Sequence, residues 1–292
     1  MYETILVPTD GSAGAEVAAR HGVTLASAFD SEIHFLSVVD DRSFSRDFEA
    51  IDPELGTVRT RFEERAHTAV DSLAELVADT GVPCETTVLT GSPAATIRKY
   101  AADAGADLIS MGTHGRTGLD RLLLGSVTER VVRTSDVPVL TSRVEPEDGD
   151  GYDRVLIPTD GSEASTAAIE HGVAIADRFD ATVHALSVIN VAGLAGAADV
   201  GPVLPDVVEA VETQAETAVE TVASRCRDRG VDVVTELSQG TPYRAIRSYV
   251  ADQDIDFVAM GTHGRTGLDR YLIGSVTERT VRTSEVPVLT VR

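Results

Sequence analysis

The chain has 292 residues, 42% of them apolar, and its 25 basic and 47 acidic residues give a net charge of -22. This length suits two domains of ordinary size. A negative field of this strength repels phosphate backbones and anionic membranes, and no run approaches the roughly 20 apolar residues of a membrane span, so nucleic-acid and membrane partners are excluded.

The first half of the chain alternates short apolar runs with stretches of helical period. The short runs are rich in β-branched residues and bounded by turn residues, which predicts strands at residues 4–9, 32–40, 84–89, 107–112 and 138–142. The stretches between them predict helices at residues 13–29, 58–79, 93–104 and 126–133. The resulting βαβαβαβαβ order predicts an α/β fold, a doubly wound parallel sheet with helices on both faces. Such sheets bind ligands at the carboxyl ends of strands where the strand order reverses, here after strands one and four.

The second half repeats the first. ILVPTDGS at 5–12 returns as VLIPTDGS at 155–162, and MGTHGRTGLDR at 111–121 recurs letter for letter at 260–270. This long period indicates two tandem domains, which we place at residues 1–144 and 152–292. The segment between them, residues 145–151, is polar and contains Pro and Gly, so it is predicted to be a linker.

The composition and the first residues of the chain also indicate the cellular environment in which we expect the protein. The excess acid is scattered over helix faces and Lys99 is the only lysine, which suits a salt-rich cytoplasm; an acidic surface from a GC-rich genome is the alternative. No basic segment or signal-like apolar core precedes the first strand, so we expect a cytoplasmic protein. Cys84 and Cys226 show no metal-binding spacing and are expected to be reduced thiols.

Repeated polar residues follow strands one and four. Strand one ends in PTDGS and strand four in GTHG, and a Gly-Ser pair that opens a helix follows ten residues after the last glycine of GTHG. Glycines allow backbone amides to approach a phosphate, and a helix N-terminus offers unpaired N–H groups and a positive dipole end. The pattern predicts a phosphate-binding loop in each half.

With its Gly-x-x-Gly-x9-Gly-Ser spacing, the chain resembles the universal stress protein family in its ATP-binding class. The resemblance implies a five-stranded fold of the adenine nucleotide alpha hydrolase-like kind. It also implies that Asp10 and Asp160 touch the nucleoside, that the backbone of Val38 and Val188 meets the adenine, and that the glycines and the first helical turn hold ribose and phosphates. The expected nucleotide-binding residues in the first half are Pro8, Thr9, Asp10, Val38, Met111, Gly112, Gly115, Arg116, Gly125, Ser126, Val127 and Thr128. Those in the second half are Pro158, Thr159, Asp160, Val188, Met260, Gly261, Gly264, Arg265, Gly274, Ser275, Val276 and Thr277.

Other roles for these residues stay open. The glycines could serve only as turns, and Asp10 could cap the first helix. His114 and His263 could act as an acid or base or could bond locally, whereas His34, His184 and the helix histidines look like packing positions. Arg116 and Arg265 could neutralise phosphate or form solvated salt bridges. A Walker-type lysine motif and a Gly-x-Gly-x-x-Gly loop after a strand are absent from the sequence, which excludes P-loop ATPases and Rossmann dehydrogenases.

These observations favour a stress-response sensor or regulator that binds ATP, one nucleotide in each domain. A slow Mg-dependent ATPase or phosphotransferase is an alternative, with Asp10 or Asp160 as candidate Mg²⁺ contacts but no evident base. An assembly protein with a structural nucleotide is another. The resembled family dimerises through the last strand, so we expect the two halves to pair within one chain, with a homodimer also possible. The segments 41–57 and 191–205 differ most between the halves and are expected to face an unknown protein partner.

Overall fold

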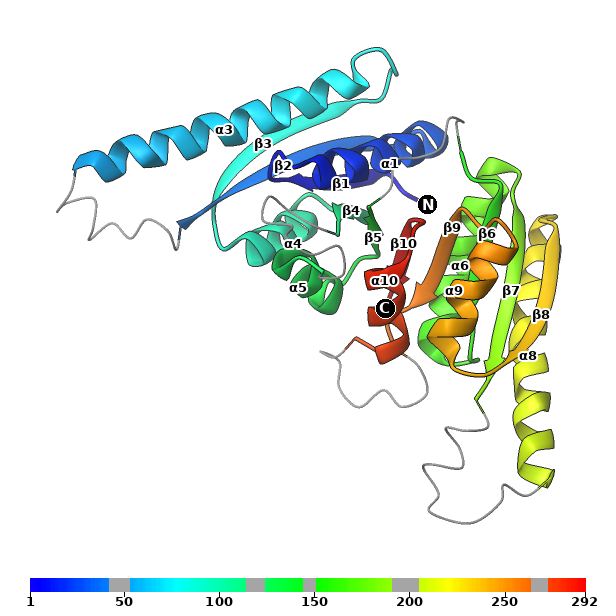
Figure 1. Ribbon diagram of the computed structural model, residues 1–292. Coiled ribbons are helices and arrows are strands. Elements are labelled where there is room, and N and C mark those ends of the chain that lie inside the picture. The colour runs from blue at the N-terminus through cyan, green and yellow to red at the C-terminus, as the bar shows by residue number, and fades with distance from the viewer. Residues whose placement is uncertain (42–52, 114–123, 144–150, 191–204, 264–272) are drawn as a thin grey trace. The chain divides into compact units, whose positions relative to one another are not determined.

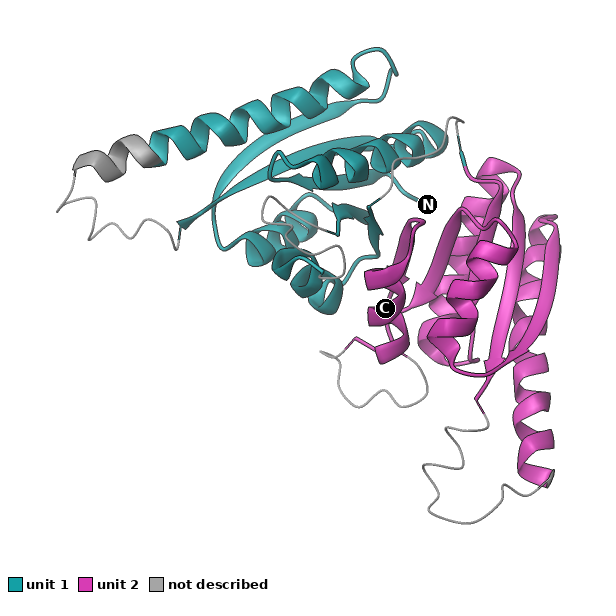
Figure 2. Cartoon of the chain, in the orientation of Figure 1, with its two compact units in different colours: residues 1–151 teal, residues 152–292 magenta. Residues whose placement is uncertain are grey.

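The structure, a computed structural model, describes residues 1–41, 53–113, 124–143, 151–190, 205–263 and 273–292. The chain forms two compact units, Met1–Gly151 and Tyr152–Arg292 (Figure 2). Apart from Gly151, the predicted linker lies outside the described residues, as do most of the two segments predicted to face a partner. Each unit is described by itself.

Unit 1 alternates strands and helices along its length (Figure 1). Its strands are β1 (Thr4–Thr9), β2 (Glu32–Asp40), β3 (Cys84–Gly91), β4 (Leu108–Gly112) and β5 (Val139–Ser142). Its helices are α1 (Ala13–Phe29), α3 (Pro53–Val77), α4 (Pro93–Asp103) and α5 (Ser126–Thr134). The largest difference from the predicted bounds is α3, which begins at Pro53 rather than at residue 58. Proline is tolerated in a first helical turn because its missing N–H would have no intrahelical acceptor there.

The five strands of unit 1 are parallel and lie in the order β3-β2-β1-β4-β5. The chain moves outward from β1 to β2 and β3 and then returns to β4 on the other side of β1, so the order reverses between β1 and β4. Helices α1 and α3 pack together on one face of the sheet, and α4 and α5 pack together on the other (Figure 1). This is the predicted doubly wound fold, and the reversal brings the carboxyl ends of β1 and β4 side by side.

Strands β1, β2, β4 and β5 are largely buried on both faces, which is why they read as near-continuous apolar runs. The edge strand β3 is exposed or half-buried along its length. The fully buried side chains of unit 1 include Ile5, Leu6, Phe35, Leu36, Ile109 and Leu140. One polar contact crosses this core: the hydroxyl of Ser110 on β4 donates to the carbonyl of Ala18 on α1 at 2.7 Å. Helix α1 is thereby fixed against the strand whose end forms half of the candidate site.

Unit 2 repeats this architecture. Its strands are β6 (Arg154–Pro158), β7 (Thr182–Ile189), β8 (Val233–Gln239), β9 (Phe257–Gly261) and β10 (Val288–Val291). Its helices are α6 (Glu163–Phe179), α8 (Pro205–Arg229), α9 (Pro242–Asp252) and α10 (Ser275–Thr283). Within the unit the parallel strands follow the order β8-β7-β6-β9-β10. The duplication seen in the sequence is therefore a duplication of the fold.

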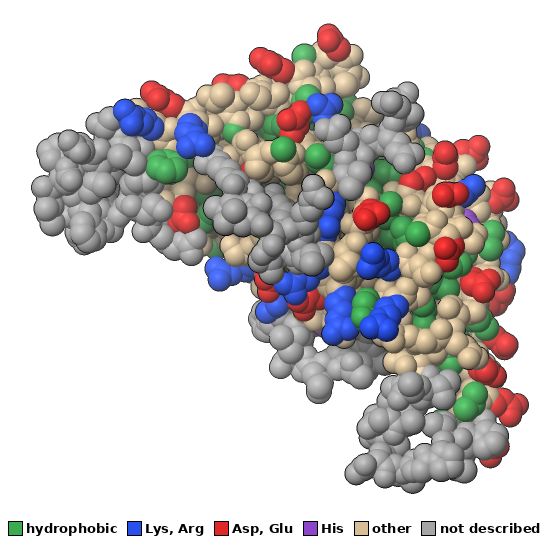
Figure 3. Space-filling view, in the orientation of Figure 1, with side chains coloured by type: hydrophobic (Ala, Val, Ile, Leu, Met, Phe, Trp, Pro, Cys, Tyr) green, Lys and Arg blue, Asp and Glu red, His purple; other side chains and the backbone are tan. Residues whose placement is uncertain are grey.

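The visible face of the molecule carries many acidic side chains. Figure 3 shows Asp and Glu side chains scattered singly and in small groups over the visible face. No helix within the described ranges is both long enough and apolar enough to cross a membrane.

Candidate functional site

The turn after β1 holds a network of short-range hydrogen bonds. The backbone N–H of Ser12 donates to Asp10 Oδ1 at 3.0 Å, and the N–H of Gly11 donates to Thr9 Oγ1 at 3.0 Å. Gly11 has φ 76°, a left-handed conformation that favours glycine. The helix cap is Ser12, whose hydroxyl accepts from the N–H of Ala15 at 3.3 Å. Asp10 is therefore not the cap of α1 but orients the turn in front of it.

The end of β4 lies against the first residues of α1. A Cβ added to Gly112 would come within 2.4 Å of the carbonyl oxygen of Gly14 and 2.5 Å of its carbonyl carbon. In unit 2, a Cβ on Gly261 would lie 2.7 Å from the same atoms of Ala164. These glycines are thus required by a close approach of two backbones, which joins the β4 end to the β1 turn.

Helix α5 begins at this same edge of the sheet. The N–H of Gly125 donates to the carbonyl of Thr113 at 2.7 Å, which fixes the start of the helix beside the end of β4. Gly125 is the N-cap, and no described side chain caps the helix, whose first residue, Ser126, is exposed. The first turn therefore presents backbone N–H groups and a positive dipole end, as an anion site needs.

Thr128, in the first turn of α5, helps to hold this helix in place. Its side chain is buried and its hydroxyl donates to the carbonyl of Gly112 at 2.8 Å; Thr277 donates to Gly261 at 2.8 Å in unit 2. These hydroxyls tie the helix to the strand end.

The remaining predicted residues divide by their burial. Thr9 and Met111 are buried in unit 1, as are Thr159 and Met260 in unit 2. The side chain of Val38, on β2, is partly exposed near the carboxyl end of that strand. Five candidate site residues lie outside the described residues: His114, Gly115, Arg116, Gly264 and Arg265.

Unit 2 builds the same edge with its own residues. Asp160 Oδ1 accepts from the N–H of Ser162 at 3.0 Å, and the N–H of Gly274 donates to the carbonyl of Thr262 at 2.7 Å. His263 lies in this loop and its Nδ1 forms a 2.9 Å hydrogen bond with Thr262 Oγ1. His263 therefore makes the local hydrogen bond that was the alternative to an acid or base role.

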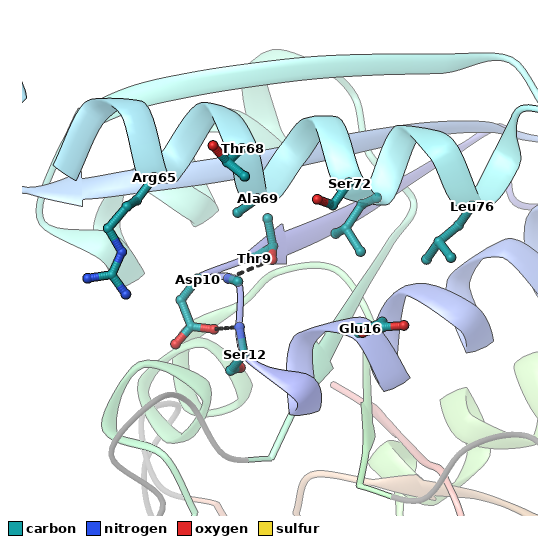
Figure 4. Close-up of a pocket in the computed structure, with 11 residues that line it drawn as sticks. Thr9, Asp10, Ser12, Glu16, Arg65, Thr68, Ala69, Ser72 and Leu76 are labelled. Atoms are coloured by element: carbon teal, nitrogen blue, oxygen red, sulfur yellow. Dashed lines mark hydrogen bonds between the residues drawn. The ribbon is translucent and has the colours of Figure 1, made fainter. Parts of the chain in front are cut away.

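A cavity of about 390 Å³ opens beside the β1 turn of unit 1 (Figure 4). One wall is the turn itself, and the other is a stripe of α3 that the sequence did not assign to the site. In Figure 4 the side chains of Arg65 and Leu76 extend from α3 toward the side of the turn and α1, and Thr68 and Ser72 of the same helix also line the cavity. Their spacing of three and four residues is the one signal that could have identified them, because it continues the apolar stripe of this helix. The volume lies within the range of small-molecule sites.

Comparisons with known proteins cover both units. The sequence profile described as "Universal stress protein family" matches residues 1–143 and 151–292. A universal stress protein of Mycolicibacterium smegmatis is 29% identical over 296 residues, which cover 99% of this chain and 96% of that protein. Another, of Methanocaldococcus jannaschii, is 36% identical over 141 residues, 48% of this chain and 82% of the relative. The crystal structure of a universal stress protein from Archaeoglobus fulgidus DSM 4304 shares the fold, with a TM-score of 0.75 and 23% identity over 99% of this chain and 98% of that one.

Proposed function

Because the chain belongs to the universal stress protein family, we propose that each of its two units binds one adenine nucleotide. ATP is the expected ligand, and the site lies at the carboxyl ends of β1 and β4 in unit 1 and of β6 and β9 in unit 2. The observation that carries this proposal is the convergence, in both units, of a carboxylate-bearing turn, a strand end that requires glycine, and a helix that starts without a side-chain cap.

The groups at this edge have the chemistry that a nucleotide needs. The first-turn amides of α5 suit the phosphates, because they donate hydrogen bonds at the positive end of the helix. Asp10 suits the ribose, because a carboxylate accepts hydrogen bonds from hydroxyl groups. A bound Mg²⁺ would offset phosphate charge, and Asp10 is the residue of unit 1 that would contact it.

We further propose that the bound nucleotide makes this cytoplasmic protein a sensor or regulator in the stress response. A ligand shifts a conformational equilibrium only if it binds one state better than the other. The helix start and the turn that hold the nucleotide belong to different layers of each unit, so occupancy favours the arrangement in which they lie together. Pairing of the two halves through their last strands, a homodimer and a protein client stay predictions.

The first test measures what the protein carries. We expect native purification at high salt, followed by acid release and chromatography, to yield two ATP per chain. ATP that remains intact over hours supports a binding sensor, whereas two ADP would indicate hydrolysis. No nucleotide, together with no thermal shift on adding Mg-ATP, would refute the proposal.

The candidate sites of units 1 and 2 differ in the helix beside the turn, α3 in unit 1 and α8 in unit 2. Buried Ala66 and Ala69 on α3 correspond to buried Ala215 and Ala218 on α8. By this alignment, the position of Arg65 is occupied by Gln214 in unit 2. A cation beside the cavity favours an anionic ligand, so we expect unit 1 to bind ATP more tightly than unit 2. Because Arg65 is exposed, its contribution is small, about 0.5–1 kcal/mol or a two- to fivefold difference in Kd.

Calorimetric titration at low and high salt measures this difference. Arg65→Gln is expected to make the two sites equivalent, and Gln214→Arg to tighten the weaker one. The gap should narrow as salt screens the charge. Two sites that already bind equally in the unmodified chain at low salt would show that Arg65 does not face the ligand.

A further inference from the structure

A second cluster of polar side chains lies at the amino ends of β2 and β3, away from the candidate nucleotide site. Glu32 and His34 are two residues apart on β2, so they share one face of the sheet. The register pairs His34 with Glu85 on β3, and in parallel strands paired residues lie on the same face. The sheet therefore brings Glu85 next to Glu32 and His34, which precede it in the sequence by 53 and 51 residues.

The three side chains converge on a small volume. His34 Nε2 lies 3.5 Å from Glu32 Oε1 and 4.0 Å from Glu85 Oε2, and one ligand atom from each residue lies within 4.8 Å of the others. His34 is buried, with 8% of its surface exposed, whereas both carboxylates reach solvent. An ion could therefore enter from the carboxylate side.

Tyr100, on α4, orients the histidine. Its hydroxyl lies 3.1 Å from His34 Nδ1 and donates to Glu85 Oε1 at 3.4 Å. When the phenol hydrogen goes to the carboxylate, the phenol oxygen accepts from His34 Nδ1–H, and the Thr87 hydroxyl, 3.3 Å away, can donate to the same oxygen. The lone pair of Nε2 then faces the carboxylates of Glu32 and Glu85. Together the three groups offer one nitrogen and two carboxylates to a single cation.

We propose that Glu32, His34 and Glu85 form a binding site for a divalent transition-metal ion of the zinc class. Zinc takes imidazole nitrogen and carboxylate oxygen at about 2.0–2.2 Å, so neighbouring ligand atoms of a tetrahedral site are about 3.4 Å apart. The distance from His34 Nε2 to Glu32 Oε1, 3.5 Å, is close to this value, whereas Glu85 Oε2, at 4.0 Å, would have to move closer to complete the site. Water would fill the fourth position. The imidazole disfavours Mg²⁺ and Ca²⁺, which prefer oxygen ligands.

The metal ligands have the outer support that such sites use. A metal-bound histidine usually donates its second N–H to a hydrogen-bond partner, which orients the ring and raises its basicity. Tyr100 is that partner here, and its ring also packs edge-on against the imidazole at 5.9 Å between centroids. The ion would link β2 to β3 and, through Tyr100, to α4.

Unit 2 contains the same framework without the acids. His184 Nδ1 lies 3.0 Å from the hydroxyl of Tyr249, with the rings 5.7 Å apart. The positions of Glu32 and Glu85, however, are occupied by Thr182 and Val234, as the strand register shows. Burial, aided by nearby Arg154, lowers the pKa of His184, which disfavours the charged imidazolium. Burial raises the pKa of Tyr249, and Glu236 lies near enough to raise it further. The histidine–tyrosine pair nevertheless does not require the two carboxylates that flank His34, because unit 2 has no acid at their positions.

The proposed site is independent of the nucleotide. Val38 is four positions beyond His34 along β2, about 13 Å at the rise of a strand. Cys84 precedes Glu85 on β3, and its side chain points to the other face of the sheet because successive side chains alternate. Cys84 is therefore not a ligand, and the test uses the Cys84→Ser background to remove any thiolate.

The experiment titrates Co²⁺ into the chelator-treated full chain at neutral pH, with salt high enough to screen the acidic surface and Mg²⁺ in excess. We expect one Co²⁺ per chain, with the visible absorption of a four-coordinate ion, displaced by one Zn²⁺. Calorimetry with Zn²⁺ should give the same stoichiometry. Tyr100→Phe should weaken binding about tenfold, as loss of an outer partner does.

The control variants exchange residues between equivalent positions of the two units. Glu32→Thr with Glu85→Val installs the residues of unit 2, which already support this fold, and should abolish the absorption. His184→Gln in unit 2 should leave it unchanged. Thr182→Glu with Val234→Glu should create a second site and raise the stoichiometry to two. Far-UV circular dichroism checks that each variant is folded.

The outcomes separate a metal site from its rival, a protonated His34 held in ion pairs. Loss of the absorption in the Glu32/Glu85 variant, with retention in His184→Gln, supports the proposal. No Co²⁺ bound in the presence of Mg²⁺, or binding that survives the Glu32/Glu85 substitutions, overturns it. Failure to find nucleotide in the purified protein would leave this result unaffected.

Discussion

Replacing Ser126 by aspartate is expected to abolish nucleotide binding in unit 1 while slightly stabilising the empty protein. Ser126 is the exposed first residue of α5, at the positive end of the helix. A carboxylate there favours the helix by about 0.3–1 kcal/mol. The same charge repels a triphosphate, and two like charges about 4 Å apart cost about 4 kcal/mol near a protein surface. After allowing for salt, we expect about a 100-fold loss of ATP affinity.

Because Ser126→Asp is expected to weaken ATP binding but to stabilise the helix, a loss of nucleotide cannot be attributed to unfolding. Nucleotide release should fall from two per chain to one in Ser126→Asp and also in Ser275→Asp, and to none in the double variant. Ser126→Ala, which removes a hydroxyl but adds no charge, should cost about tenfold at most. A Ser126→Asp chain that still carries two nucleotides would mean that the α5 start does not face the phosphates.

The second large effect is expected from Gly112→Ala. The added methyl group would lie 2.4 Å from the carbonyl oxygen of Gly14, well inside van der Waals contact, and that oxygen belongs to backbone. Helix α1 cannot easily retreat, because Ser110 is bonded to Ala18 and the helix is packed on the sheet. We expect unit 1 to lose about 3 kcal/mol, the upper end of the range for overpacking, together with its nucleotide.

Hydrogen exchange resolved by unit measures this loss, because a single melting temperature does not describe two domains. Gly261→Ala should destabilise unit 2 in the same way. Gly105→Ala is the control: this glycine has φ 66° and no atom within 4 Å of an added Cβ. Strain without a clash should cost about 1–2 kcal/mol and leave nucleotide binding intact. Equal losses from Gly112→Ala and Gly105→Ala would remove the case for a required close approach.

Much of the fold could be predicted from local patterns. The bounds of β1, α1 and β2 agree with the predicted ranges because strand and helix periodicity, together with cap residues such as Ser12, are written within a few neighbouring positions. The duplication fixed the number of units in the same way. The glycines and the Gly-Ser pairs also marked the loops of the candidate site, because phosphate binding requires residues with little or no side chain.

The sequence by itself therefore determined the two α/β units, the order of their elements, and the turns that form the candidate nucleotide site. Only the tertiary structure decided which distant residues meet. It gave α3 and Arg65 a place at the cavity wall, and it brought His34, a predicted packing position, between Glu32 and Glu85. Such contacts depend on strand register and helix packing, which arise from the whole core rather than from any local pattern. A spacing of 51 residues between His34 and Glu85 carries no signal until the strands pair.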